Sequence, residues 1–183
     1  LALFSVPPQS MSSTALILNV LVSGISFVVF SRSGHKSSAL LWPFVLGSVP
    51  AAFVGGMLVI PHNMYGFLLA VALATAAIRL GFGNIDPKGA GETRKHPQMI
   101  TAISIGALIG LLSGIIGIGG GVFLGPILLL LNWSDVKEAA VTCAGFIFVN
   151  SLAALAGRGY QGTLETSSLV PFLVATLVGG AIG

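Results

Sequence analysis

Charged residues are scarce in this sequence. Asp, Glu, Lys and Arg make up 7% of its 183 residues, whereas hydrophobic residues make up 55%. So little polar surface could not cover a water-soluble globule of this length. The uncharged stretches are also long enough to cross a hydrocarbon layer about 30 Å thick. We therefore expect an integral membrane protein whose main partner is the lipid bilayer.

Cysteine and metal-binding motifs are nearly absent as well. Cys143 is the only cysteine, so an intrachain disulfide or a cysteine-rich metal site is not possible. No HExxH motif and no serine, cysteine or carboxylate constellation points to an enzyme, and we expect no catalytic residues, no metal site and no cofactor. An intramembrane enzyme is kept only as a third interpretation. The net charge of +3 is not gathered into a basic patch with interleaved aromatics, so we expect no nucleic-acid partner.

Long uncharged runs, separated by short polar stretches, make up most of the chain. In lipid the backbone must satisfy its own hydrogen bonds, which leaves helices or closed barrels. Barrel strands alternate apolar and polar residues over about ten positions, and these runs do not. The sequence therefore predicts an all-α, polytopic membrane bundle with helices in six runs: 8–30, 39–60, 64–78, 99–131, 139–157 and 167–183.

A weak internal repeat divides the chain. Asn19, within Leu-Asn-Val-Leu-Val-Ser, resembles Asn150, within Val-Asn-Ser-Leu-Ala-Ala; residues 42–46 resemble residues 170–174. Such duplication is typical of secondary transporters. We expect a first repeat at 1–82, truncated at its N-terminus and holding about three helices, and a second repeat at 99–183, truncated at its C-terminus. Between them, 83–98 reads as a polar linker.

Basic residues give the topology. If run 99–131 crosses the membrane once, all of them except Lys137 share one face, which should be cytoplasmic, together with the linker: Arg32, Lys36, Arg79, Lys88, Arg94, Lys95 and Arg158. Asn19 and Asn150 would then lie on helices of the same direction, giving parallel halves. If run 99–131 crosses twice, Lys137 and Arg158 exchange sides and the bias is equally strong. Charge alone does not choose between the two.

A glycine-rich segment opens the second repeat. Gly119, Gly120 and Gly121, followed by Pro126, should break run 99–131, since each interior glycine costs about 1 kcal/mol relative to alanine and proline removes a donor. The half-helix after the break would present bare amides and a positive dipole end, which favour an anion. The alternative is close helix packing, which we prefer for the glycines spaced by four: Gly106, Gly110 and Gly114.

Polar residues within the apolar runs complete the candidate site. Ser12 and Asn19 lie in the first half, and Thr142, Asn150 and Ser151 lie at comparable places in the second. Each could instead bond to its own helix or to a neighbour. The repeated asparagines favour a functional role, because asparagine is harder to satisfy within one helix. We predict a substrate site made of Ser12, Asn19, Gly119, Gly120, Gly121, Thr142, Asn150 and Ser151.

These segments carry a family resemblance. The run Leu-Ser-Gly-Ile-Ile-Gly-Ile-Gly-Gly-Gly at 112–121, Pro126, the segment 136–142 and Asn150-Ser151 resemble the sulfite exporter TauE/SafE family. The resemblance implies an eight-helix carrier of the bacterial inner membrane, built from two four-helix repeats and associated with sulfite, sulfonates and other sulfur-containing anions. In that frame the chain would hold helices two to six and most of seven.

The leading hypothesis is therefore a multi-pass secondary transporter of a small, sulfur-containing anion in the bacterial inner membrane. The alternative is a non-transporting scaffold or accessory subunit whose glycines serve packing alone. The sequence leaves the oligomeric state, the coupling ion and the transport direction open.

Overall fold

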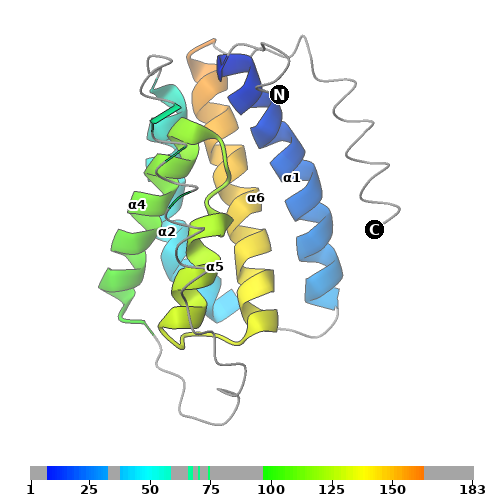
Figure 1. Ribbon diagram of the computed structural model, residues 1–183, viewed down its shortest axis with the longest axis vertical. Helices are drawn as coiled ribbons and strands as arrows, with labels where there is room; N and C mark the ends of the chain where they lie inside the picture. The colour runs from blue at the N-terminus through cyan, green and yellow to red at the C-terminus, as the bar shows by residue number, and fades with distance from the viewer. Residues whose placement is uncertain are drawn as a thin grey trace.

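The computed structural model describes residues 8–32, 38–58, 66–67, 70, 74 and 97–162. Five helices run through these segments: α1 (Pro8–Arg32), α2 (Ser38–Met57), α4 (Met99–Ile116), α5 (Gly121–Leu130) and α6 (Val136–Tyr160). All except α5 are long and apolar enough to cross a membrane. The expected all-α membrane fold is confirmed (Figure 1). Most of the linker 83–98 and the runs 64–78 and 167–183 lie outside the described residues.

Helix ends follow from local sequence. Asp135 precedes α6, and its carboxylate accepts a hydrogen bond from the Glu138 amide at 2.7 Å, which caps the helix N-terminus. At the other end of the bundle, α4 ends at Gly117, whose φ of 85° lies in the left-handed region that favours glycine. The Gly117 amide donates to the Ser113 carbonyl at 2.7 Å, and the helix goes no further.

Helices α2 and α4 pack closely and run parallel. A Cβ added to any of three α4 glycines would overlap the backbone of α2. The overlap would be with Phe44 for Gly106, with Ser48 for Gly110 and with Ala52 for Gly114. Each step of four along α4 is thus matched by a step of four along α2. The packing role predicted for these three glycines is confirmed.

Helix α6 packs against α2 on one side and α1 on the other. Gly157 has no room for a Cβ beside Phe53 of α2. Toward α1, Gly145 lies against Phe27 and Phe148 lies against Gly24, whereas the side chain of Arg158 reaches Ser12. Because residue numbers rise along α6 as they fall along α1, these two helices run antiparallel.

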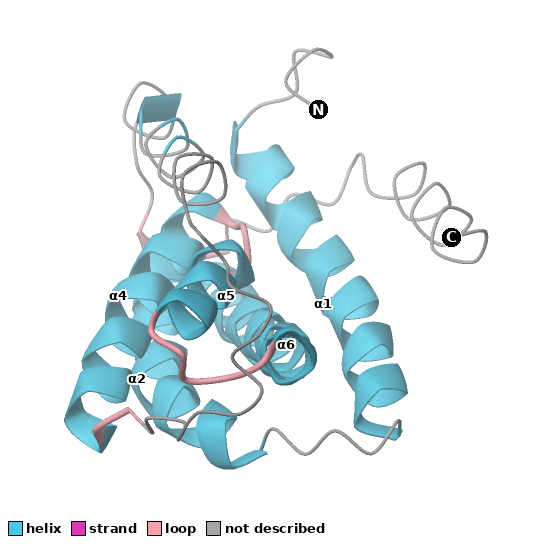
Figure 2. Ribbon diagram, turned by 60° about the horizontal axis from the view of Figure 1, so that its bottom comes forward, coloured by secondary structure: helices cyan, strands magenta, loops and turns pink. Residues whose placement is uncertain are grey.

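Helix α5 returns toward the end where α4 begins. The contacts of the chain with α6 move back along α6: Gly119 lies against Ser151, Gly121 against Ile147 and Gly125 against Cys143. Helix α5 therefore runs antiparallel to α6. Trp133, just after α5, lies 6.1 Å from Phe44 between ring centroids, on the first third of α2. The α4 helix is about 27 Å long and α5 about 15 Å, so the chain crosses once and comes back through half the bundle. Figure 2 shows α5 beside α2, α4 and α6.

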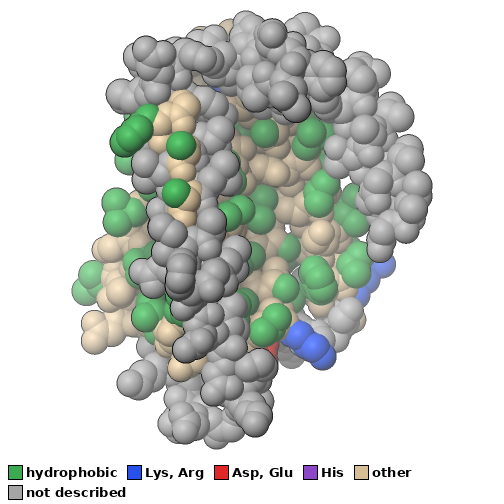
Figure 3. All heavy atoms as spheres, in the orientation of Figure 1, with side chains coloured by type: hydrophobic (Ala, Val, Ile, Leu, Met, Phe, Trp, Pro, Cys, Tyr) green, Lys and Arg blue, Asp and Glu red, His purple; other side chains and the backbone are tan. Residues whose placement is uncertain are grey.

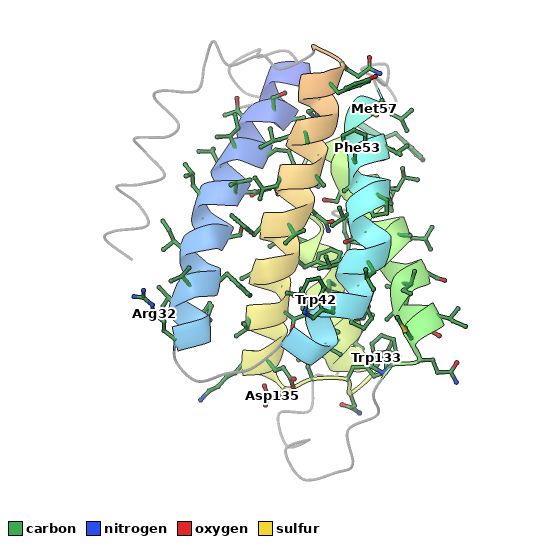
Figure 4. All side chains as sticks on the ribbon, turned by 180° about the vertical axis from the view of Figure 1, so that it is seen from behind. Arg32, Trp42, Phe53, Met57, Trp133 and Asp135 are labelled. Atoms are coloured by element: carbon green, nitrogen blue, oxygen red, sulfur yellow. The ribbon has the colours of Figure 1, made fainter. Side chains whose placement is uncertain are left out.

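This path decides between the two topologies that the basic residues left open, and run 99–131 enters the bundle and returns. Arg32 and Asp135 lie at the same end of the bundle, and Phe53 and Met57 lie at the other (Figure 4). Lys137, two residues after Asp135, therefore shares the end of Arg32, and Arg158 lies at the opposite end, buried. The helices of Asn19 and Asn150 consequently run in opposite directions, because run 99–131 makes no net crossing.

The outer faces of the helices carry large exposed apolar side chains. Among them are Ile25 on α1, Trp42 on α2, Ile100 and Leu108 on α4, and Leu152 on α6. Figure 3 shows such side chains over the described part of one face, with Lys and Arg side chains gathered at its lower right. In a membrane these faces contact lipid, whereas the buried apolar core joins α2, α4, α5 and α6.

Candidate functional site

The chain leaves helical geometry at residues 117–120, between α4 and α5. Gly117, Gly119 and Gly120 have φ values of 85°, 81° and 78°, a conformation that side chains other than glycine rarely adopt. The first hydrogen bonds of α5 run from the Phe123 and Leu124 amides to the Gly120 carbonyl, at 3.1 and 3.2 Å. The amides of Gly121 and Val122 therefore have no acceptor within the helix. The predicted break is confirmed, and it begins at Gly117.

This glycine loop, residues 117–120, descends between α1, α4 and α6. A Cβ placed on Gly119 would lie 3.1 Å from Nδ2 of Asn19 and 3.2 Å from Oγ of Ser151. A Cβ on Gly120 would lie 2.9 Å from atoms of both Ile109 and Phe146 and 3.3 Å from Cβ of Ser113. Glycine is thus required for its dihedral angles and for space, and polar side chains of α1, α4 and α6 lie beside the loop.

Two predicted residues of α1 hold the end of α4. The hydroxyl of Ser12, which is 2% exposed, donates to the Ile116 carbonyl at 3.0 Å. Asn19 donates through Nδ2 to the Gly117 carbonyl at 3.4 Å. These bonds satisfy carbonyls that the helix break frees, so Ser12 and Asn19 attach α1 to the beginning of the glycine loop.

Asn150 and Ser151 of α6 are fully buried, at 0% exposure. Within the described part of the chain, Oδ1 and Nδ2 of Asn150 and Oγ of Ser151 have no hydrogen-bond partner, and the same holds for Oγ of Ser113 on α4. A buried polar group without a partner costs about 1–3 kcal/mol. Their concentration beside bare helix amides is therefore typical of a site that binds a polar ligand.

Thr142 is the predicted site residue that the structure does not bring together with the others. Its Oγ1 donates to the Glu138 carbonyl of its own helix at 2.7 Å. It lies eight residues before Asn150, or about 12 Å along the axis of α6. Gly121, in contrast, begins α5 directly beside Ile147 of α6, within the site.

Arg158 was missed as a site residue by sequence reasoning, which used it only as one of the basic residues that indicate the topology. Its guanidinium is buried, at 6% exposure, and Nη2 donates to Oγ of Ser12 at 2.7 Å and to the Gly114 and Ile115 carbonyls at 3.3 and 3.2 Å. A cation at the carboxyl end of α4 complements the helix dipole. The available signal was spacing, since Arg158 follows Ser151 by seven residues and therefore shares its helix face.

Comparisons with known proteins agree with this architecture. The sequence model of the family described as sulfite exporter TauE/SafE matches residues 1–183. The probable membrane transporter protein y4hK of Sinorhizobium fredii (strain NBRC 101917 / NGR234) is 34% identical, over all of this chain and 74% of that protein. The probable membrane transporter protein YunE of Bacillus subtilis (strain 168) is 24% identical, over 97% of this chain and 71% of that protein. No solved structure matches significantly. With its apolar spanning helices and broken helix, the chain is a multi-pass membrane transport protein that belongs to the sulfite exporter TauE/SafE family.

Proposed function

We propose that this protein moves small, sulfur-containing anions across the bacterial inner membrane as a secondary transporter, and that the glycine loop and the N-terminus of α5 form its anion site. One observation carries the proposal: the broken helix begins again at Gly121, a buried residue whose amide has no acceptor within the helix, and fully buried hydroxyl and carboxamide groups of the same bundle have no partner among the described residues. Membership of a family described as sulfite exporters supports the sulfur chemistry.

The electrostatics of the site favour negative charge. The N-terminus of a helix carries roughly half a positive elementary charge, and consecutive glycines let an anion approach the amides closely. Ser151 and Ser113 lie on opposite sides of the loop, against Gly119 and Gly120, and can add hydroxyl donors. Ser12 and Asn19 shape the site by holding the end of α4.

The orientation follows from the basic residues at one end of the bundle. Arg32 and Lys137 share that end, and both lie at helix ends rather than in the apolar interior. We assign it to the cytoplasm, because short cytoplasmic connections carry an excess of Lys and Arg. The linker 83–98, which precedes α4 at the same end, would then be cytoplasmic too.

Uptake of radiolabelled sulfite into vesicles holding the full-length protein tests the proposal. Ser151→Ala should lower the affinity for sulfite about tenfold, since a hydrogen bond to a charged ligand is worth about 1.5–3 kcal/mol. Ser48→Ala is the matched control: Ser48 is also 0% exposed, but its hydroxyl donates to the Val45 carbonyl of its own helix, at 3.4 Å. Saturable uptake that is identical in wild type and Ser151→Ala would contradict the assigned site.

A packing-only role is the second candidate, and the close α2–α4 contact at Gly106, Gly110 and Gly114 favours it. It predicts a folded protein that shows no saturable uptake of sulfite or of any other small anion. Absence of such uptake in well-folded wild-type protein would support a scaffold or accessory subunit.

A further inference from the structure

Asn150 presents two separate hydrogen-bonding groups inside the bundle. Both Nδ2 and Oδ1 are buried without a partner among the described residues, and the residue is 0% exposed. A hydroxyl can turn to act as donor or acceptor, but a carboxamide has a fixed donor side and a fixed acceptor side. A ligand that satisfies Asn150 must therefore offer an acceptor and a donor together.

Asn150 lies on the side of α6 that meets the glycine loop, since Phe146, Ile147 and Ser151 of the same helix face lie against loop glycines. Phe146, one turn earlier on α6, contacts Gly120, and so does Ile109 on α4. Helix α6 runs parallel to α2, since Gly145 lies beside Leu41 and Gly157 lies beside Phe53, and α4 also runs parallel to α2; α4 and α6 therefore run in the same direction. Asn150 and Ser113, each four residues after one of these contacts, consequently occupy the same level on the two helices, next to the glycine loop.

The rest of the site differs from Asn150 in chemistry. The amides of Gly121 and Val122 can only donate, and the helix end favours negative charge. The Oδ1 atom of Asn150 would instead repel the oxygens of a fully deprotonated anion, and its burial would then remain uncompensated. A ligand with negative oxygens at one side and an O–H or N–H group at another satisfies both parts.

We propose that the substrate of this site is a small anion that also carries a hydrogen-bond donor, so that sulfite is bound as singly protonated hydrogen sulfite rather than as the dianion. Asn150 Oδ1 accepts from that donor, and Nδ2 donates to one of the oxygens. This inference rests on the proposed anion site and specifies which anions it selects.

Sulfamate and methanesulfonate test the inference without a change of pH. Both are small, permanently ionised monoanions of similar shape, but sulfamate carries N–H donors where methanesulfonate carries a methyl group. Each is added as a competitor of labelled sulfite uptake by the full-length protein in vesicles. Sulfamate should compete about tenfold better, which corresponds to one well-placed hydrogen bond.

Asn150→Leu should abolish this preference while both anions still compete, and Ser48→Ala should keep it. Equal competition in the wild type, no competition by either anion, or an unchanged preference in Asn150→Leu would overturn the inference. Saturable sulfite uptake by the wild type in the same assay shows separately whether the proposed function stands. If Asn150→Leu does not fold, the wild-type comparison decides, and Asn150→Ser supplies a smaller group that retains a donor and an acceptor.

Discussion

Replacing Arg158 with leucine removes the charged link between three helices. The guanidinium of this α6 residue bonds to Ser12 of α1 and to the last carbonyls of α4, with all three contacts made by Nη2. That nitrogen carries only two hydrogens, so the contact at 2.7 Å to Ser12 is one full bond, and the two carbonyls at 3.2 and 3.3 Å share the other. The expected loss is that of two charge-assisted bonds rather than three.

The magnitude follows from these two bonds. Each is worth about 1.5–3 kcal/mol, so their removal costs about 3–6 kcal/mol. Leucine returns part of this through apolar burial, which leaves a net loss of about 2–4 kcal/mol. For a chain of this size about 1 kcal/mol corresponds to about 2–4 °C in Tm, so we expect Arg158→Leu to lower Tm by about 10 °C. Arg158→Lys should recover roughly half, because its ammonium keeps a charged donor but ends a shorter side chain that cannot reach the place of Nη2 as well.

The assay is thermal unfolding of the purified full-length protein in detergent. Lys137→Leu is the control, since Lys137 is exposed in the first turn of the same helix and loses only a solvated charge. It should shift Tm by less than about 2 °C. If Arg158→Leu is as stable as this control, the three contacts contribute nothing, and the role assigned to Arg158 at the end of α4 is wrong.

Three further predictions concern the loop, the packing and the topology. Gly120→Ala should lower Tm more than Gly162→Ala. Both glycines have positive φ, which costs alanine about 1–2 kcal/mol, but an added Cβ meets Ile109 and Phe146 at Gly120 and nothing within 4 Å at Gly162. Equal Tm shifts would contradict the described contacts. Gly110→Val should lower Tm by several degrees, because the added side chain overpacks against the backbone of Ser48 at a cost of about 1–3 kcal/mol or more. Gly66→Val is the control, since a Cβ added there meets nothing within 4 Å, and it should not lower Tm. Equal Tm shifts in the two variants would count against the α2–α4 register. In vesicles of known orientation, Arg32→Cys and Lys137→Cys should react with an impermeant thiol reagent from one side of the membrane, and Gln161→Cys should react from the other side. If Arg32→Cys and Lys137→Cys react from opposite sides, run 99–131 crosses the membrane only once.

Composition and periodicity were sufficient for the fold class, because a chain with 7% charged residues has few ways to bury its backbone in lipid. The helix break could also be located, since glycine and proline act locally through dihedral angles and missing donors. The same local logic separated Gly106, Gly110 and Gly114, whose spacing of four indicates packing, from the loop glycines. These successes share one property: each depends on residues close in sequence.

The path of the chain after the helix break could not be predicted, because it depends on which helices α5 packs against. A single and a double crossing by run 99–131 agreed equally well with the distribution of basic residues. In either topology Arg158 was assigned to a solvated face. Its burial arises from Ser12, 146 residues away, and from the carbonyls freed at the end of α4. Thr142 differs in the opposite way: sequence grouped it with Asn150 and Ser151, but its hydroxyl already donates to the Glu138 carbonyl of its own helix. The role of the site residues itself stays a prediction.

The return of α5 also changes how the two asparagines relate to each other. A net crossing by 99–131 would have related their helices by an axis along the membrane normal, but α1 and α6 run antiparallel on either side of the glycine loop. Any repeat that relates Asn19 to Asn150 must therefore be inverted, with its axis in the membrane plane. Inverted repeats exchange inward-open and outward-open states around a fixed site, so an inverted relation between Asn19 and Asn150 agrees with the secondary transport proposed above.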